Sequence, residues 1–243
     1  MHPASWITFY MDSITQGFIK AFWLILNLNP DLVGIILLSL KVSGFALVIA
    51  TLLGLPVGAF LGLRRFPGRG VVVNTINTFM GLPPVVVGLF VYLLLSRRGP
   101  LGVLGLLYTP TAMVMAQTIL AAPIVIALCR SAIVSVDPII SQAARTLGAT
   151  RGQVTVTIIK EARYGILSAI IAAFGRVMAE VGSILIVGGN IAGYTRVMTT
   201  TIALETDKGN FELALALGII LLLISFLING ALHFVQKKGL VPT

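Results

Sequence analysis

The chain has 243 residues, of which 57% are hydrophobic and only 10% are charged, and its mean hydropathy is +1.02. Soluble domains carry about 25% charged residues, so this composition excludes a soluble domain. It predicts an all-α integral membrane protein, because helices satisfy their own backbone hydrogen bonds within the bilayer.

The first 30 residues predict an amphipathic helix that lies in the membrane surface. On a helical wheel, polar and apolar side chains separate onto opposite sides, with two tryptophans as interfacial anchors. The polar side carries Asp12, Gln16, Lys20 and Asn27, the apolar side carries Ile14, Phe18, Phe22 and Ile25, and the tryptophans are Trp6 and Trp23. A sixth span is the alternative, but Asp12 and Lys20 would then need partners inside the membrane. The segment lacks the pattern of a cleaved signal peptide.

Residues 31–238 form the predicted transmembrane domain, followed by a short tail, 239–243. Five apolar segments are each long enough for the ~20 residues that cross a bilayer. They lie near residues 36–63, 71–96, 107–133, 164–189 and 212–236.

The second span contains a predicted break in the sequence FMGLPP, at Gly81, Pro83 and Pro84. The two prolines remove two backbone donors and push Leu82 away from helical geometry. Protein or a water-filled cavity must cover the freed carbonyls. The break is therefore either a gate or a static kink.

The loop 134–163 contains a short predicted helix, DPIISQAARTLG, at residues 137–148. Asp137 can cap its first turn, Pro138 suits the first helical position, and Gly148 can end it in the left-handed conformation. Ile139, Ala143 and Leu147 fall on one face. Together with the small Ala144, this face predicts a helix that docks in a groove of another protein.

Two charged residues fall inside the fourth span. Arg176 and Glu180 are spaced i, i+4, which on one helix puts them on one face. Ionised residues at membrane depth pair with each other or face a cavity. The two side chains therefore form either a structural ion pair, or part of the transport path or of the contact with a second copy of the subunit.

Residues 188–210 form a polar, glycine-rich loop between the fourth and fifth spans. Its hydroxyl, amide and guanidinium donors suit a small tetrahedral oxyanion, or else the loop is a structural plug. Arg97 and Arg98, predicted on the same side, would add an attractive field. The candidate donors are Asn190, Tyr194, Thr195, Arg196, Thr199, Thr200 and Thr201.

The distribution of basic residues predicts the orientation. Ten Lys and Arg residues lie on the side of the loop 134–163, and six lie on the other side. Basic loops stay in the cytoplasm, so we expect this loop and the C-terminus inside the cell and the N-terminus outside. The net charge of +9 then follows from topology and implies no nucleic-acid partner.

The loop 134–163 also resembles a known family. Gln142, Ala143 and Ala144, three residues, Gly148, nine residues and Ile158 resemble the pattern E-A-A-x3-G-x9-I-x-L-P of permease subunits of ABC importers. The resemblance implies that this is the coupling helix, and carries over Asp137, Gln142, Ala143, Ala144, Arg145 and Gly148 as ATPase-coupling residues. Gln142 replaces the usual glutamate, and Lys160 and Glu161 replace Leu-Pro.

Residues from about 38 to 235 resemble the permease subunit of a tungstate or molybdate ABC importer of the binding-protein-dependent type I class. The segments that carry this resemblance are LLSLKVSG from Leu37, LRRFPGR from Leu63, NTFMGLPPVVVGL from Asn77, LSRRGPLG from Leu95 and VGGNIAGYTRVMTTTIALETDKG from Val187. It implies a homodimer in the prokaryotic cell membrane with two cytoplasmic ATPase subunits and an extracytoplasmic oxyanion-binding protein. It also implies alternating access driven by the ATPases. Tungstate is the expected substrate, with molybdate, phosphate or sulfate as alternatives.

The sequence gives less support to three other functional classes: an ATPase, a secondary transporter and an intramembrane enzyme. A GxxxxGK[ST] phosphate loop is absent, so we expect ATP and magnesium to bind the partner ATPase and this chain to hold no cofactor. A secondary transporter would usually show internal repeats, and the five predicted spans show no convincing repeat. An intramembrane enzyme would need a nucleophile or metal set, but His2 and His233 lie near opposite ends, no HExxH occurs, and Cys129 is the single cysteine, so we predict no catalytic or metal residues.

Overall fold

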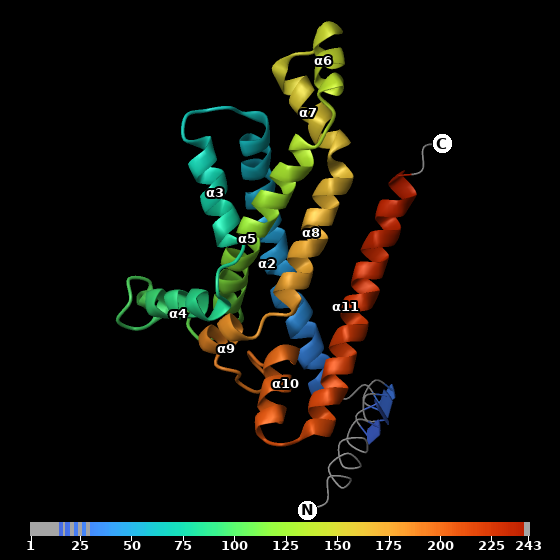
Figure 1. The fold of residues 1–243 in the computed structure, drawn as a ribbon. Helices are drawn as coiled ribbons and strands as arrows, with labels where there is room; N and C mark the ends of the chain where they lie inside the picture. Colours follow the sequence, from blue (N-terminus) through green and yellow to red (C-terminus); the bar gives the residue numbers. More distant parts are fainter. Residues whose placement is uncertain (1–14, 17, 20–21, 24–25, 28–29, 241–243) are drawn as a thin grey trace, which may run out of the picture. The chain divides into compact units, whose positions relative to one another are not determined.

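A computed structural model of the 243-residue chain describes residues 15–16, 18–19, 22–23, 26–27 and 30–240. Most of the predicted surface helix 1–30 and the tail from 241 lie outside the described residues. Within them every regular element is a helix (Figure 1). The helices are α2 (Pro30–Leu63), α3 (Arg69–Phe79), α4 (Pro84–Leu95), η1 (Gly102–Leu104), α5 (Pro110–Val134), α6 (Pro138–Thr146), α7 (Arg151–Glu161), α8 (Arg163–Met178), α9 (Gly182–Gly188), α10 (Met198–Asp207) and α11 (Phe211–Leu240).

The five apolar segments form three continuous helices and two bent pairs among the described residues. Helices α2, α5 and α11 are each long and apolar enough to cross a membrane. The pairs α3 with α4 and α8 with α9 each pass the same test together, with a sharp bend at a short break. The break in the second span confirms the prediction from Pro83 and Pro84. The fourth span was predicted as one helix, which is wrong, because α8 ends at Met178 and α9 begins at Gly182.

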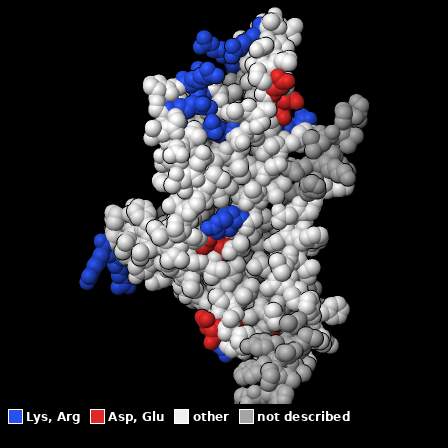
Figure 2. Space-filling view, viewed as in Figure 1, with Lys and Arg blue, Asp and Glu red and all other residues white. Residues whose placement is uncertain are grey.

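Large apolar side chains cover much of the described surface, as a lipid environment requires. Leu52 of α2, Val71 of α3 and Phe226 of α11 are all strongly exposed. Few charged side chains interrupt the face in Figure 2. A contiguous apolar surface of this kind would be a liability in water, so it identifies the side of each helix that meets lipid or another membrane helix.

The chain divides into two compact units. Unit 1 comprises Met1–Ser43, Pro84–Ala116 and Met178–Gly230. In it α4 and α9 pack so closely that a Cβ atom at Gly88 would lie 2.8 Å from Ser183 Cα, and one at Gly182 would lie 2.9 Å from Val85 Cγ2. Glycine permits this backbone contact. The Ser39 hydroxyl oxygen accepts a hydrogen bond from the buried Met198 N–H at 2.8 Å, which joins α2 to α10.

Unit 2 comprises Gly44–Pro83, Gln117–Val177 and Ala231–Thr243. Three glycines of α2, spaced four residues apart, face α5 within this unit. A Cβ atom at Gly54 would lie 2.8 Å from Val125 Cγ1, one at Gly58 would lie 2.8 Å from the carbonyl oxygen of Ile126, and one at Gly62 would lie 2.9 Å from Ile133 Cγ2. Small residues at this spacing let two membrane helices approach closely.

Candidate functional site

The helix predicted to dock on a partner is α6, and its first turn is capped as the sequence indicated. The Asp137 carboxylate accepts a hydrogen bond from the Ile139 N–H at 2.8 Å, and Pro138 occupies the first helical position. This satisfies one of the free N–H groups at the helix start. The carboxylate also complements the positive end of the helix dipole.

The end of α6 forms a complete Schellman motif. Gly148 has a φ of +79°, its N–H donates to the Arg145 carbonyl at 3.0 Å, and the Ala149 N–H donates to the Ala144 carbonyl at 3.0 Å. These two bonds define the motif, and the predicted left-handed glycine is confirmed. The next helix, α7, starts at Arg151, and a capping box between Thr150 and Gln153 closes its first turn. Helix α6 is therefore short and fixed at both ends.

The apolar face of α6 has no covering element within the described structure. Ile139 is 65% exposed, Leu147 is 87% exposed, and Ala143 between them is exposed. Gln142 and Arg145 are also exposed, whereas Ala144 is half-buried. A rigid helix with an exposed Ile-Ala-Leu face is suited to insertion into an apolar cleft.

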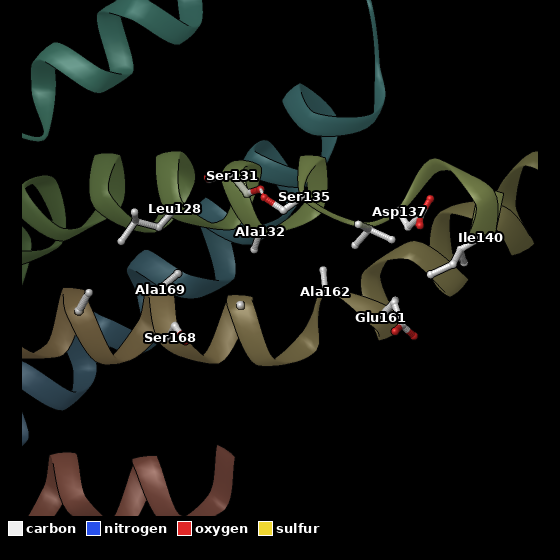
Figure 3. A pocket seen from close by; sticks show the side chains of 13 residues that line it. Leu128, Ser131, Ala132, Ser135, Asp137, Ile140, Glu161, Ala162, Ser168 and Ala169 are labelled. Carbon is white, nitrogen blue, oxygen red and sulfur yellow. Dashed lines mark hydrogen bonds between the residues drawn. The ribbon is translucent and has the colours of Figure 1, made fainter. Parts of the chain in front are cut away.

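A groove of about 720 Å³ in unit 2 separates α5 from α8 near the base of the loop 134–163. Figure 3 shows its walls of small side chains, including Ser131, Ala132, Ser168 and Ala169. Asp137 and Glu161 lie at one end of it in this view. The two carboxylates make this groove unsuitable for an anion.

Glu180 lies outside a helix, in the break between α8 and α9. Its carboxylate accepts a hydrogen bond from the Ser183 N–H at 3.0 Å, and its carbonyl accepts one from the Thr199 hydroxyl at 2.8 Å. The prediction that Arg176 and Glu180 share one helix face is wrong, because α8 ends at Met178. The buried Glu180 caps α9 and ties it to α10. An ion pair with Arg176 stays a prediction.

The threonines proposed as anion donors are buried and already donate hydrogen bonds. The hydroxyl of Thr195 donates to the Gly188 carbonyl at 2.6 Å and accepts from the Ile191 N–H at 2.9 Å. Those of Thr200 and Thr201 donate to the Val197 carbonyl at 3.0 and 2.8 Å. A hydroxyl has one hydrogen to donate. The prediction that Thr195, Thr199 and Thr200 offer donors to an anion therefore disagrees with this structure. Their hydroxyls donate to backbone carbonyls instead.

The candidate donors that remain in this loop are Asn190, Tyr194 and Arg196, of which the Asn190 amide already donates one hydrogen bond to the Thr200 carbonyl at 3.5 Å. An Arg196 Nη2 hydrogen bond to the Asn190 carbonyl, at 3.3 Å, holds the guanidinium, while Arg196 Nε and Asn190 Oδ1 are buried without partners. Tyr194 and Arg196 line a cavity of about 860 Å³ in unit 1, which Lys41 of α2 also lines. This cavity brings two cations and a phenol to one place. Arg97 and Arg98 are exposed in the turn after α4.

The second basic residue of the loop 188–210 is Lys208, which is paired with the carboxylate of Glu205. Lys208 donates a hydrogen bond to Glu205 at 2.9 Å, and Asn210 donates another at 3.0 Å. The Lys208 hydrogen bond, aided by Asn210 and the charges of Lys208 and Arg196, holds the pKa of the Glu205 carboxyl below its usual range. Because this carboxylate stays charged, Lys208 adds little attraction for an anion.

Comparison with known proteins agrees with this geometry. The family described as "Binding-protein-dependent transport system inner membrane component" matches residues 54–238. A probable anion ABC transporter permease protein of Haloferax volcanii is 47% identical, over 82% of this chain and 88% of its own. The tungstate uptake system permease protein TupB of Peptoclostridium acidaminophilum is 40% identical, over 94% of this chain and all of its own. The inward-facing MetNI methionine ABC transporter has a chain of similar fold, with a TM-score of 0.71 at 20% identity, over 85% of this chain and 95% of its own.

The chain belongs to the family of inner-membrane components of binding-protein-dependent transport systems, and it has the type I ABC importer permease fold. It is therefore a membrane permease subunit rather than an enzyme. Two signals in the sequence were missed. The first is the glycine spacing at Gly54, Gly58 and Gly62, which marks the α2–α5 contact. The second is Lys41, which lines the same cavity as Arg196, a juxtaposition that only the fold reveals.

Proposed function

We propose that this chain is the permease of a tungstate importer. The observation that carries the proposal is the 40% identity to a tungstate uptake permease along nearly the whole chain. The exposed, doubly capped α6 supports coupling to a separate ATPase, which would bind ATP and magnesium. Two copies of the permease would form the pathway, and an extracytoplasmic binding protein would deliver the oxyanion.

Helix α6 is the proposed contact with the ATPase. Closure of the ATPases on ATP would move α6 as a rigid body, because its two caps prevent fraying. The break at Gly81, Pro83 and Pro84 is then a candidate gate, since the two prolines have no N–H to donate and Gly81 bonds only three residues back, to the Thr78 carbonyl. Hydrolysis would return the permease to its inward-facing state. This is the alternating-access cycle.

The orientation is tested by labelling single cysteines. In a Cys129→Ala background, we expect Gln142→Cys in α6 to react with an impermeant maleimide only after the cytoplasmic side is opened. Thr206→Cys in α10 is exposed as well, and should react in intact cells. Protein without an introduced cysteine gives the background. The opposite labelling pattern would reverse the proposed topology.

The cavity around Arg196 is the proposed outer anion site. We expect Arg196→Gln to lower the initial rate of tungstate uptake below saturation at least about tenfold, because one charge-assisted hydrogen bond is worth about 1.5–3 kcal/mol. Basal ATPase activity of the assembled complex should be unchanged. Lys208→Gln is the matched control, since Lys208 is already paired with Glu205. Equal uptake by wild type and Arg196→Gln across tungstate concentrations would make the loop a structural plug.

A further inference from the structure

Unit 2 contains a second, strongly basic cavity, to which the proposed function assigns no role. Its volume is about 730 Å³, and a single carboxylate, Asp137, faces its arginines. Figure 2 shows Lys and Arg side chains gathered around the part of the molecule that carries α6 and α7. The arginines that line the cavity are Arg64, Arg65, Arg69, Arg130, Arg145 and Arg151.

The arrangement of these side chains favours a bound anion. Six guanidinium groups, four of them exposed and two half-buried, line one cavity and create a field that attracts an anion. Asp137, which also accepts the Ile139 N–H, supplies one negative charge against the six guanidinium groups. Arg130 Nε is buried without a hydrogen-bond partner, which is costly unless an acceptor enters the cavity. Arg69 is held in place by its Nε hydrogen bond to the Leu61 carbonyl at 2.8 Å.

The position of the cavity indicates the kind of anion. Arg64 and Arg65 directly follow the last residue of α2, and Arg130 lies one turn before the end of α5. Residues at the ends of spanning helices lie at the level of lipid headgroups. Apolar side chains line the same cavity beside the arginines, as a ligand with a charged head and an apolar body requires: Leu63, Ile133, Val134, Val154 and Ile158.

The cavity lies beside the apolar face of α6 that forms the proposed ATPase contact, and it shares Asp137 and Arg145 with the residues that the family resemblance assigns to coupling. The residues of α6 that line it are Pro138, Ser141 and Arg145, whereas Ile139, Ala143 and Leu147 of the apolar face do not. We propose that this cavity binds a phosphate group, and that the group is the headgroup of an anionic phospholipid. Free inorganic phosphate has the same chemistry, and basic pockets beside spanning helices suit such headgroups.

The test uses the purified full-length chain in detergent. Thermal unfolding is followed in micelles that contain increasing phosphatidylglycerol or phosphatidylcholine, and separately in sodium phosphate against sodium chloride of equal ionic strength. We expect phosphatidylglycerol to raise the midpoint saturably. The Arg64→Gln/Arg65→Gln variant should weaken the apparent affinity about tenfold, through lost charge-assisted hydrogen bonds.

The Arg97→Gln/Arg98→Gln variant removes the same charge from an exposed adjacent pair and should respond like wild type. Equal midpoints of the three proteins in phosphatidylcholine verify that they fold. A saturable response to sodium phosphate that Arg64→Gln/Arg65→Gln weakens supports the phosphate site and assigns it to free phosphate. The proposal is overturned if neither probe stabilises the protein, or if both variants respond like wild type. It is also overturned if Arg64→Gln/Arg65→Gln loses ATPase assembly while its lipid response is unchanged, since the arginines would then serve the protein contact.

Discussion

Gly58→Ala should destabilise the permease, whereas Gly44→Ala in the same helix should leave its stability unchanged or slightly higher. A Cβ atom at Gly58 would lie 2.8 Å from the Ile126 carbonyl oxygen and 3.2 Å from the Arg130 N. Both are backbone atoms of α5, so α2 and α5 must move apart. Overpacking of this kind costs about 1–3 kcal/mol. For a chain of this size we expect the unfolding midpoint to fall by about 2–4 °C per kcal/mol.

Gly44 is the matched control because nothing lies within 4 Å of a Cβ atom there. Alanine is a better helix former than glycine by about 1 kcal/mol. Gly44→Ala therefore measures this gain in helix propensity alone, without the clash between α2 and α5 that Gly58→Ala adds. Thermal unfolding of both variants in the same detergent measures the difference. Equal midpoints would contradict the close α2–α5 contact. Gly58→Leu should go further and prevent accumulation of folded protein in the membrane.

Ala143→Arg in α6 should abolish coupled transport without harming the fold. Ala143 is exposed between Ile139 and Leu147, so the new side chain meets solvent in the isolated permease. In a cleft of the ATPase it would bring a charge and a long side chain into an apolar contact. The loss of a central interface residue costs about 2 kcal/mol or more, so we expect assembly to weaken at least about 30-fold.

Co-purification of the ATPase with tagged permease measures this effect, together with ATPase activity stimulated by the binding protein. Val156→Arg, at an exposed position of α7, makes the same change outside the proposed contact and should assemble normally. Gly148→Val should also reduce assembly, because a branched residue at a φ of +79° would unwind the end of α6. Full transport by the Ala143→Arg variant would show that α6 does not couple the permease to the ATPase.

Local chemistry explains which elements the sequence could predict. The limits of α6 follow from Asp137, Pro138 and Gly148, because capping depends on neighbouring residues alone. The break of the second span follows from Pro83 and Pro84 for the same reason. The five apolar segments follow from the thickness of the bilayer.

The features that could not be predicted depend on contacts between distant residues. No proline marks the end of α8 at Met178, and α9 starts where Glu180 accepts the Ser183 N–H. The threonines between residues 195 and 201 were predicted to be donors for an anion. In the structure their hydroxyls donate hydrogen bonds to carbonyls of the same loop and of Glu180. Composition alone could not distinguish a hydroxyl that hydrogen-bonds to the backbone of the loop from one that binds an anion.

Tungstate accumulation in proteoliposomes tests the central claim most directly. The permease is reconstituted with its ATPase inside and the purified oxyanion-binding protein outside, and initial uptake of tungstate is measured with and without ATP. We predict accumulation only when ATP, ATPase and binding protein are all present, with molybdate as a competitor that shows the preference. Accumulation by the permease alone, driven by an ion gradient, would contradict the claim and make the chain a secondary transporter.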